Sequence, residues 1–116
     1  MKSPRSSRDH LQDILAEARK ALGFVAGMSA AEFRADEKTA YAVVRALEVM
    51  GEATKHVPPD IRERHPELPW RAMAGIRDKL IHDYVNVNLE VVWRTVTEDL
   101  PPLLPALQRI LDETQP

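Results

Sequence analysis

Apolar residues recur every three or four positions in the first part of the chain, which is the spacing of one face of a helix. Charged residues fill most of the positions between them, and Gly27 is a residue type at which helices commonly end. The apolar set is Leu11, Ile14, Leu15, Ala18, Leu22 and Val25. The pattern predicts an amphipathic helix over residues 7–27.

A second periodic segment begins at Ser29-Ala30-Ala31-Glu32, where a serine is followed three positions later by a glutamate. This is the capping-box pattern, in which the two side chains satisfy N–H groups at a helix start. The apolar stripe is Val43, Leu47, Met50 and Thr54, and a second face carries Tyr41, Arg45, Glu48 and Glu52. We expect one long helix over 29–56, with Asp36 as the place where it could break, ended by Val57-Pro58-Pro59.

The rest of the chain is interrupted by prolines, which divide it into shorter helical segments. A connector with at most one helical turn, in residues 60–65, leads to Pro69, after which Trp70, Met73, Ile76 and Leu80 predict a helix over 70–84. Another helix is expected from the cap Asn88, with an interruption at Pro101-Pro102. The short alternation around residues 85–87 is a poor strand signal. The chain should therefore be one all-α domain spanning residues 1–116, an antiparallel bundle of four to five helices.

Composition fits a folded protein and excludes several kinds of site. Of the 116 residues, 44% are hydrophobic and 29% charged, so the chain resembles ordinary globular proteins rather than disordered ones. The lack of cysteine excludes disulfides, thiolate zinc sites and cysteine nucleophiles. The longest apolar run, residues 21–28, is far too short to cross a bilayer, and the basic N-terminus is followed by no signal-like segment. We expect a cytoplasmic protein without membrane association.

Charge is distributed unevenly along the chain. The formal net charge of −2 is too weak to indicate nucleic-acid binding by itself. Residues 55–82 carry six basic and four acidic side chains, whereas residues 83–116 carry two basic and six acidic ones. If the protein contacts a phosphate, the middle segment is the favoured place.

The residues best suited to chemistry lie together at 77–84. On a regular helix Asp78 and His82, four positions apart, would share a face, and the carboxylate could hold the imidazole in one tautomer for acid–base chemistry. Arg77 and Tyr84 would share another face, and a guanidinium suits a phosphate. Arg77 and His82, however, would be roughly 140° apart around an ideal helix. Either the helix unwinds near His82 or a symmetry-related copy completes the site.

The pattern Arg77, four residues, His82, one residue, Tyr84 resembles the motif of HEPN domains in the form found in HepT-like proteins. Further segments resemble that family in the same order, and together with the motif they cover most of the chain. They are residues 45–53 (RALEVMGEA), 68–70 (LPW), 92–93 (VW) and 100–101 (LP). The family usually has asparagine where this chain has Asp78; aspartate could orient His82 more strongly or weaken substrate binding.

The resemblance implies a metal-independent endoribonuclease, without cofactor, that acts on RNA as a homodimer with the motif helices facing a shared cleft. It implies that His82 activates the ribose 2′-hydroxyl or protonates the leaving oxygen, that Arg77 stabilises charge on the phosphate, and that Asp78 orients the pair. It also implies the toxin of a toxin–antitoxin system. A minimal nucleotidyltransferase antitoxin would neutralise it by attaching AMP to Tyr84, adding bulk and negative charge where the RNA phosphate sits.

Other interpretations of these residues stay open. His82 could be a cap or core histidine, Arg77 and Asp78 a solvated helix face, and Tyr84 an aromatic anchor. The residues Arg45, Glu48 and Glu52 could line the cleft or join helices, the two tryptophans are expected in the core, and His10, His56 and His65 are expected on the surface without metal-ligand spacing. The alternative function is a non-catalytic HEPN module that binds nucleotides or docks a nucleotidyltransferase; a purely structural helical adaptor is a third hypothesis.

Overall fold

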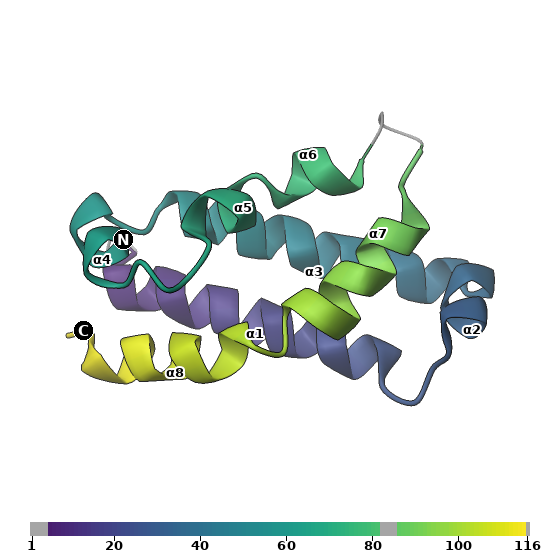
Figure 1. Cartoon of the computed structure of the whole chain (residues 1–116), viewed down its shortest axis with the longest axis horizontal. Coiled ribbons are helices and arrows are strands. Elements are labelled where there is room, and N and C mark those ends of the chain that lie inside the picture. Colours follow the sequence, from purple (N-terminus) through teal and green to yellow (C-terminus); the bar gives the residue numbers. More distant parts are fainter. Residues whose placement is uncertain (1–4, 82–85, 116) are drawn as a thin grey trace.

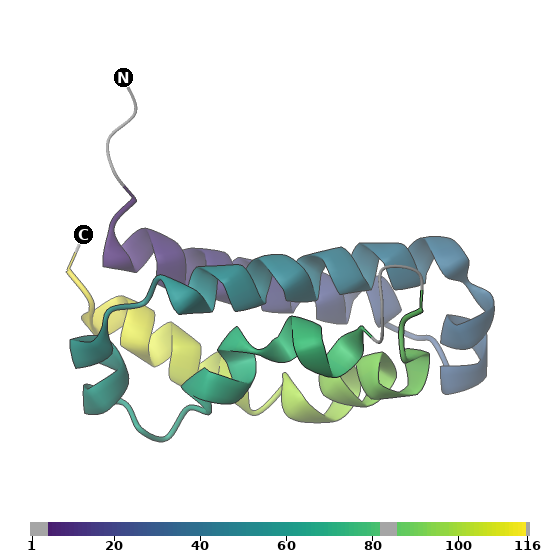
Figure 2. The same cartoon turned by 90° about the horizontal axis from the view of Figure 1, so that it is seen from above.

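Two long antiparallel helices form the central pair of the bundle. The computed structural model describes residues 5–81 and 86–115. Helices α1 (Ser7–Val25) and α3 (Glu37–Lys55) lie side by side along the length of the molecule and make the most extensive contact between any two described elements (Figures 1 and 2). The periodic positions of both helices are buried, as the sequence predicts, except Leu22, which is half-buried, and the all-α fold class is confirmed.

Side-chain caps fix where the first helices begin. Ser6 caps α1, and Ser29 caps the short α2 (Ala30–Ala35) in a capping box with Glu32. The backbone N–H groups that donate to these carboxylates lower the pKa of Glu32 and likewise that of Asp36, which caps α3 through the N–H of Thr39 at 3.0 Å. The expected break at Asp36 is confirmed, because this residue ends α2 and starts α3.

The predicted single helix over 70–84 is wrong. Two short helices, α5 (Trp70–Ala74) and α6 (Ile76–Leu80), meet at Gly75, and α4 (Pro59–Arg64) precedes them. Helix α6 ends because Ile81 is extended, with φ −113° and ψ 119°, and forms an antiparallel bridge with Val87. The last residues predicted for this helix lie outside the described part of the chain.

The C-terminal part returns along the bundle in two pieces. Asn88 caps α7 (Leu89–Arg94), as predicted, and a π-helical turn, η1 (Thr95–Asp99), follows. The expected interruption at Pro101-Pro102 separates this turn from α8 (Leu103–Glu113), which packs along α1 (Figure 1). None of the helices in residues 5–81 and 86–115 is long and apolar enough to cross a membrane.

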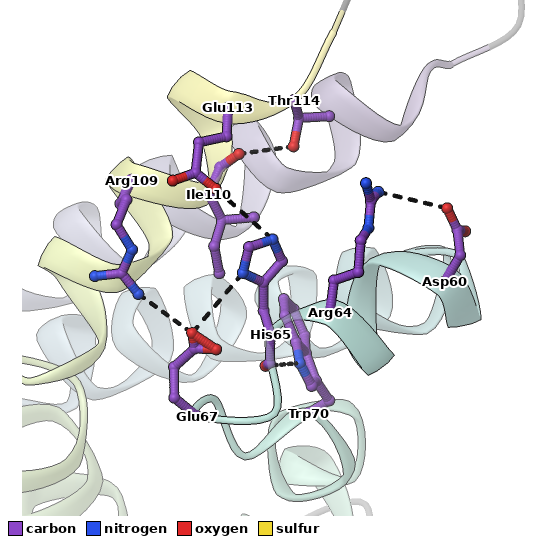
Figure 3. A network of polar contacts seen from close by, with 9 residues as sticks. All are labelled: Asp60, Arg64, His65, Glu67, Trp70, Arg109, Ile110, Glu113 and Thr114. Atoms are coloured by element: carbon purple, nitrogen blue, oxygen red, sulfur yellow. Dashed lines mark hydrogen bonds and ion pairs between the residues drawn. The ribbon is translucent and has the colours of Figure 1, made fainter.

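A histidine joins the connector between α4 and α5 to α8. The ring of His65 lies between Glu67 and Glu113, with its Nδ1 3.8 Å and its Nε2 4.0 Å from their carboxylates (Figure 3). Arg109 of α8 also pairs with Glu67, at 3.2 Å, and the Nε1–H of Trp70 donates to the carbonyl of His65. His65 was expected on the surface but is half-buried, because its ring packs between the connector and α8.

Candidate functional site

The short helix α6 presents the first residues of the predicted motif. Its buried Ile76 and Leu80 anchor it to the core, and they leave Arg77 and Asp78 on the exposed side. At its end, the carbonyl of Leu80 accepts the N–H of Asn88 at 2.8 Å. The chain before residue 82 and the chain after residue 85 are therefore held next to each other.

Helix α6 approaches α3 closely at a glycine. A Cβ atom on Gly51 would lie 2.8 Å from Cγ2 of Ile76 and 3.2 Å from the carbonyl oxygen of Met73. Real Cβ atoms essentially never show the shorter distance, so any side chain here would push α5 and α6 away from α3. Gly51 thus determines how near Arg77 lies to the polar face of α3.

Arg77 is held on that face by a carboxylate. Its Nε lies 3.3 Å from Oε2 of Glu48, and the Glu48 side chain is only 26% exposed whereas that of Arg77 is 69% exposed. Among the described residues, Glu48 is the one ion-pair partner of Arg77. The contact uses Nε, so the outer nitrogens of the guanidinium can donate to a bound anion.

An open pocket of about 390 Å³ adjoins this ion pair. Its polar lining comes from α1, α3, α6 and Arg5, which precedes α1. Arg45, Glu48, Glu52 and His56 belong to α3 and its end, His10 and Asp13 to α1, and Arg77 to α6. Arg45, Glu48 and Glu52 line this pocket, and Glu48 also joins α3 to α6 through Arg77; that the three residues line a cleft shared by two subunits stays a prediction.

Each carboxylate of the pocket has a basic partner. Asp13 pairs with Arg5, whose pKa it raises, and Glu52 lies 3.3 Å from Nε2 of His56. With Glu48 on Arg77, this leaves Arg45 as the lining arginine that makes no ion pair or hydrogen bond within the part of the chain that the structure describes. Its guanidinium is available to an anion entering the pocket.

Two histidines that no sequence pattern connects meet at the pocket. The rings of His10 and His56 stack with centroids 5.0 Å apart and an angle of 18° between their planes. They are brought together because α1 and α3 are antiparallel, which places the start of one helix beside the end of the other. This pair could be predicted only if the register of α1 against α3 were known.

The other predicted site residues are only partly placed. His82 and Tyr84 lie outside the described residues. The spacing argument that joined Asp78 to His82 is wrong, because α6 ends at Leu80 and Ile81 is extended. The ideal-helix angle of roughly 140° between Arg77 and His82 does not apply for the same reason, and of the two alternatives given for it, the end of α6 at Leu80 agrees with unwinding of the helix near His82. The side chain of Asp78 is exposed and makes no hydrogen bond or ion pair with residues 5–81 or 86–115.

A second, more open hollow lies on the other basic part of the middle segment. It is lined by an apolar floor that includes Leu68 and Trp70, and by the cations Arg62, Arg71 and Lys79. No carboxylate belongs to its described lining, although Lys79 lies 3.5 Å from Asp99 nearby. The predicted preference of the middle segment for anions agrees with this distribution.

Comparisons with known proteins match nearly the whole chain to one family. Residues 14–110 match the family described as "Ribonuclease HepT-like". The chain is 48% identical over 99 residues to the protein named "Probable ribonuclease HepT" of Thermococcus cleftensis, covering 85% of this chain and 90% of that protein. It is 40% identical over 113 residues to a protein of Caldanaerobacter subterraneus named "Putative RNase", covering 97% and 98% of the two chains.

A relative in Methanocaldococcus jannaschii, also named "Putative RNase", is 39% identical over 108 residues, covering 93% of this chain and 89% of its own. No solved structure matches the chain. The family match and the relatives span the segments that carry Arg45, Glu48, Gly51 and the motif from Arg77 to Tyr84. The chain therefore belongs to the HepT-like ribonuclease family.

Proposed function

We propose that the protein is a metal-independent endoribonuclease whose site is built around Arg77 and His82, with Asp78 as a positioning residue. The observation that carries the proposal is the guanidinium of Arg77, which Glu48 holds at 3.3 Å beside an open pocket, five positions before His82 in the motif. The ribonuclease names of the relatives support the same activity.

In this proposal the reaction is an internal transfer at one phosphodiester. His82 takes the proton of the ribose 2′-hydroxyl, or gives a proton to the leaving 5′-oxygen, while the 2′-oxygen attacks phosphorus. Arg77 donates to the non-bridging oxygens, where negative charge increases in the transition state. Glu48 fixes the guanidinium, which reduces the entropy lost when the phosphate binds. The products are a 2′,3′-cyclic phosphate and a 5′-hydroxyl.

One imidazole cannot serve both oxygens at once, which supports a homodimer as the working form. A second copy that faces the first would supply a second His82, so that one imidazole acts as base and the other as acid. The short α6 and the exposed side chains on it leave this part of the surface open to such a partner.

RNA would reach the site over the basic surface of the middle segment. The cations Arg62, Arg71 and Lys79 around the second hollow suit backbone phosphates, and its apolar floor suits a base or a ribose. Because the whole chain has a net charge of −2, electrostatic affinity should be modest and sensitive to salt.

The test is cleavage by the purified protein in the presence of EDTA. We expect cut RNA whose fragments end in a 2′,3′-cyclic phosphate and a 5′-hydroxyl, since this chemistry needs an imidazole and a guanidinium but no metal ion. RNA ends are identified by their response to phosphatase and kinase. Intact RNA with measurable binding would contradict the nuclease and favour the non-catalytic nucleotide-binding alternative.

We also propose that the protein is the toxin of a pair, silenced when a small nucleotidyltransferase attaches AMP to Tyr84. After co-expression with such a partner, intact-mass measurement should show added AMP units, and Tyr84→Phe should abolish them because the acceptor oxygen is gone. The chain has only one other tyrosine, Tyr41, whose side chain is exposed. Tyr41→Phe is thus a matched control that should keep the label, and a label lost there and kept in Tyr84→Phe would overturn the assignment.

A further inference from the structure

We infer that the pocket between α1, α3 and α6 is a nucleotide subsite in which one base of the RNA stacks on the His10–His56 pair while its phosphate contacts Arg45 and Arg77. The inference rests on the proposed function, because it takes RNA as the substrate. It adds a platform for the base, formed by residues outside the motif.

The histidine pair has the features of a stacking platform. The rings are already nearly parallel, with 18° between them, and the His56 side chain is 57% exposed, so one ring face can receive a further planar group. Glu52, 3.3 Å from Nε2 of His56, restrains the ring from the same helix. Every nucleobase has a π face, so such a platform accepts any base.

The charges of the pocket explain why stacking should contribute much of the binding there. Arg5, Arg45 and Arg77 are balanced by Asp13, Glu48 and Glu52, so the lining does not attract phosphate strongly as a whole. Arg45 lacks a carboxylate partner among the described residues, and Arg77 uses only its Nε for Glu48. These two guanidinium groups can therefore hold one phosphate while the imidazoles hold its base.

The size of the pocket suits a single nucleotide. Its volume of about 390 Å³ lies at the lower end of the range of roughly 300–1,000 Å³ typical of small-molecule sites. The imidazoles belong to the start of α1 and the end of α3, whereas Arg45 lies in the middle of α3 and Arg77 on α6, so the two kinds of contact come from different parts of the lining. A base and its phosphate also present their binding groups at separate ends.

The experiment measures binding without cleavage. A fluorescent oligonucleotide with 2′-O-methyl riboses cannot react by internal transfer, so its anisotropy reports affinity whether or not the protein is a nuclease. We expect His56→Ala to weaken binding about fivefold or more, the loss typical of a base–aromatic stack, and His56→Phe to stay near wild type because the ring is kept. Tyr41→Ala, which removes an exposed aromatic ring from the same helix outside the pocket, should have no effect.

A second oligonucleotide that lacks bases separates stacking from a structural role of His56. Wild type and His56→Ala should bind it equally, because no base is present to stack. For the phosphate, Arg45→Gln should weaken binding of both oligonucleotides, whereas Arg64→Gln, an exposed arginine outside the pocket, should not. Equal affinity of wild type and His56→Ala for the base-containing oligonucleotide would overturn the inference, even if RNA cleavage by the wild type is confirmed. If the wild type did not cleave RNA but His56→Ala still weakened binding of the base-containing oligonucleotide, only the proposed nuclease activity would be overturned.

Discussion

Replacing His82 with alanine is expected to slow RNA cleavage by about 10²-fold or more, the usual contribution of a positioned acid–base group. The expectation depends on the proposed site, in which His82 follows α6 by two residues and Arg77 lies on the α3 face. The residues that flank residues 82–85 are held in place. Ile81 forms a bridge with Val87, and the carbonyl of Leu80 accepts a hydrogen bond from the N–H of Asn88.

Initial cleavage rates of the purified proteins on one labelled RNA measure the effect. Arg77→Lys should also be slow, because a single ammonium cannot pair with Glu48 through one nitrogen and still present a planar fork to the phosphate. Glu90→Gln, an exposed change on the other side of the segment, serves as the control and should cleave like wild type. Equal rates for His82→Ala and wild type, with both proteins folded by circular dichroism, would remove His82 from the mechanism.

The sequence predicted the elements that local chemistry determines. Helix α1, the capped start at Ser29, the break at Asp36 and the cap at Asn88 all depend on neighbouring residues, and all are confirmed. The prediction of one helix over 70–84 was wrong at its end because that end depends on a contact with a residue outside the predicted helix. Ile81 is extended where it pairs with Val87, which lies beyond the segment and could not be assigned as its partner from periodicity.

The apolar spacing of Trp70, Met73, Ile76 and Leu80 also concealed the break at Gly75. All four side chains are buried, because α5 and α6 turn the same side toward the core although they are separate helices. A pattern of buried positions reports the side that faces the core, and it does not report whether the backbone between them is continuous. The angle of roughly 140° between Arg77 and His82 assumed an unbroken helix, and the end of α6 at Leu80 agrees with the alternative that the helix unwinds near His82.

The residues of the candidate site also fall into two groups, those that a local pattern identifies and those that only packing brings together. Arg45, Glu48 and Glu52 were recognisable as one polar face of a helix, and the motif identified Arg77. The His10–His56 pair was not recognisable, because it requires the register of α1 against α3, which no local pattern contains. Residues that join the site through packing, rather than through a motif, are those that a sequence alone leaves out.

Replacing Gly51 with valine is the second change with a large expected effect, here on stability. The free energy of unfolding should fall by about 1–3 kcal/mol, the cost of overfilling a packed contact, because the new Cβ would lie 2.8 Å from Ile76 and 3.2 Å from the Met73 carbonyl. The carbonyl belongs to the backbone of α5, so the strain cannot be relieved by turning one side chain.

Gly23 offers a matched control for this change, since it is also a helical glycine. Among the described residues, no atom outside the neighbouring backbone of its own helix lies within 4 Å of the position that its Cβ would take. Gly23→Ala should therefore raise the free energy of unfolding, by up to about 1 kcal/mol from helix propensity, whereas Gly51→Ala should gain less or lose stability because crowding opposes the same gain. Urea denaturation of the four proteins measures both effects. If Gly51→Val unfolded at the wild-type urea concentration, α6 would not be tightly seated on α3, and the placement of Arg77 beside Glu48 would lose its structural basis.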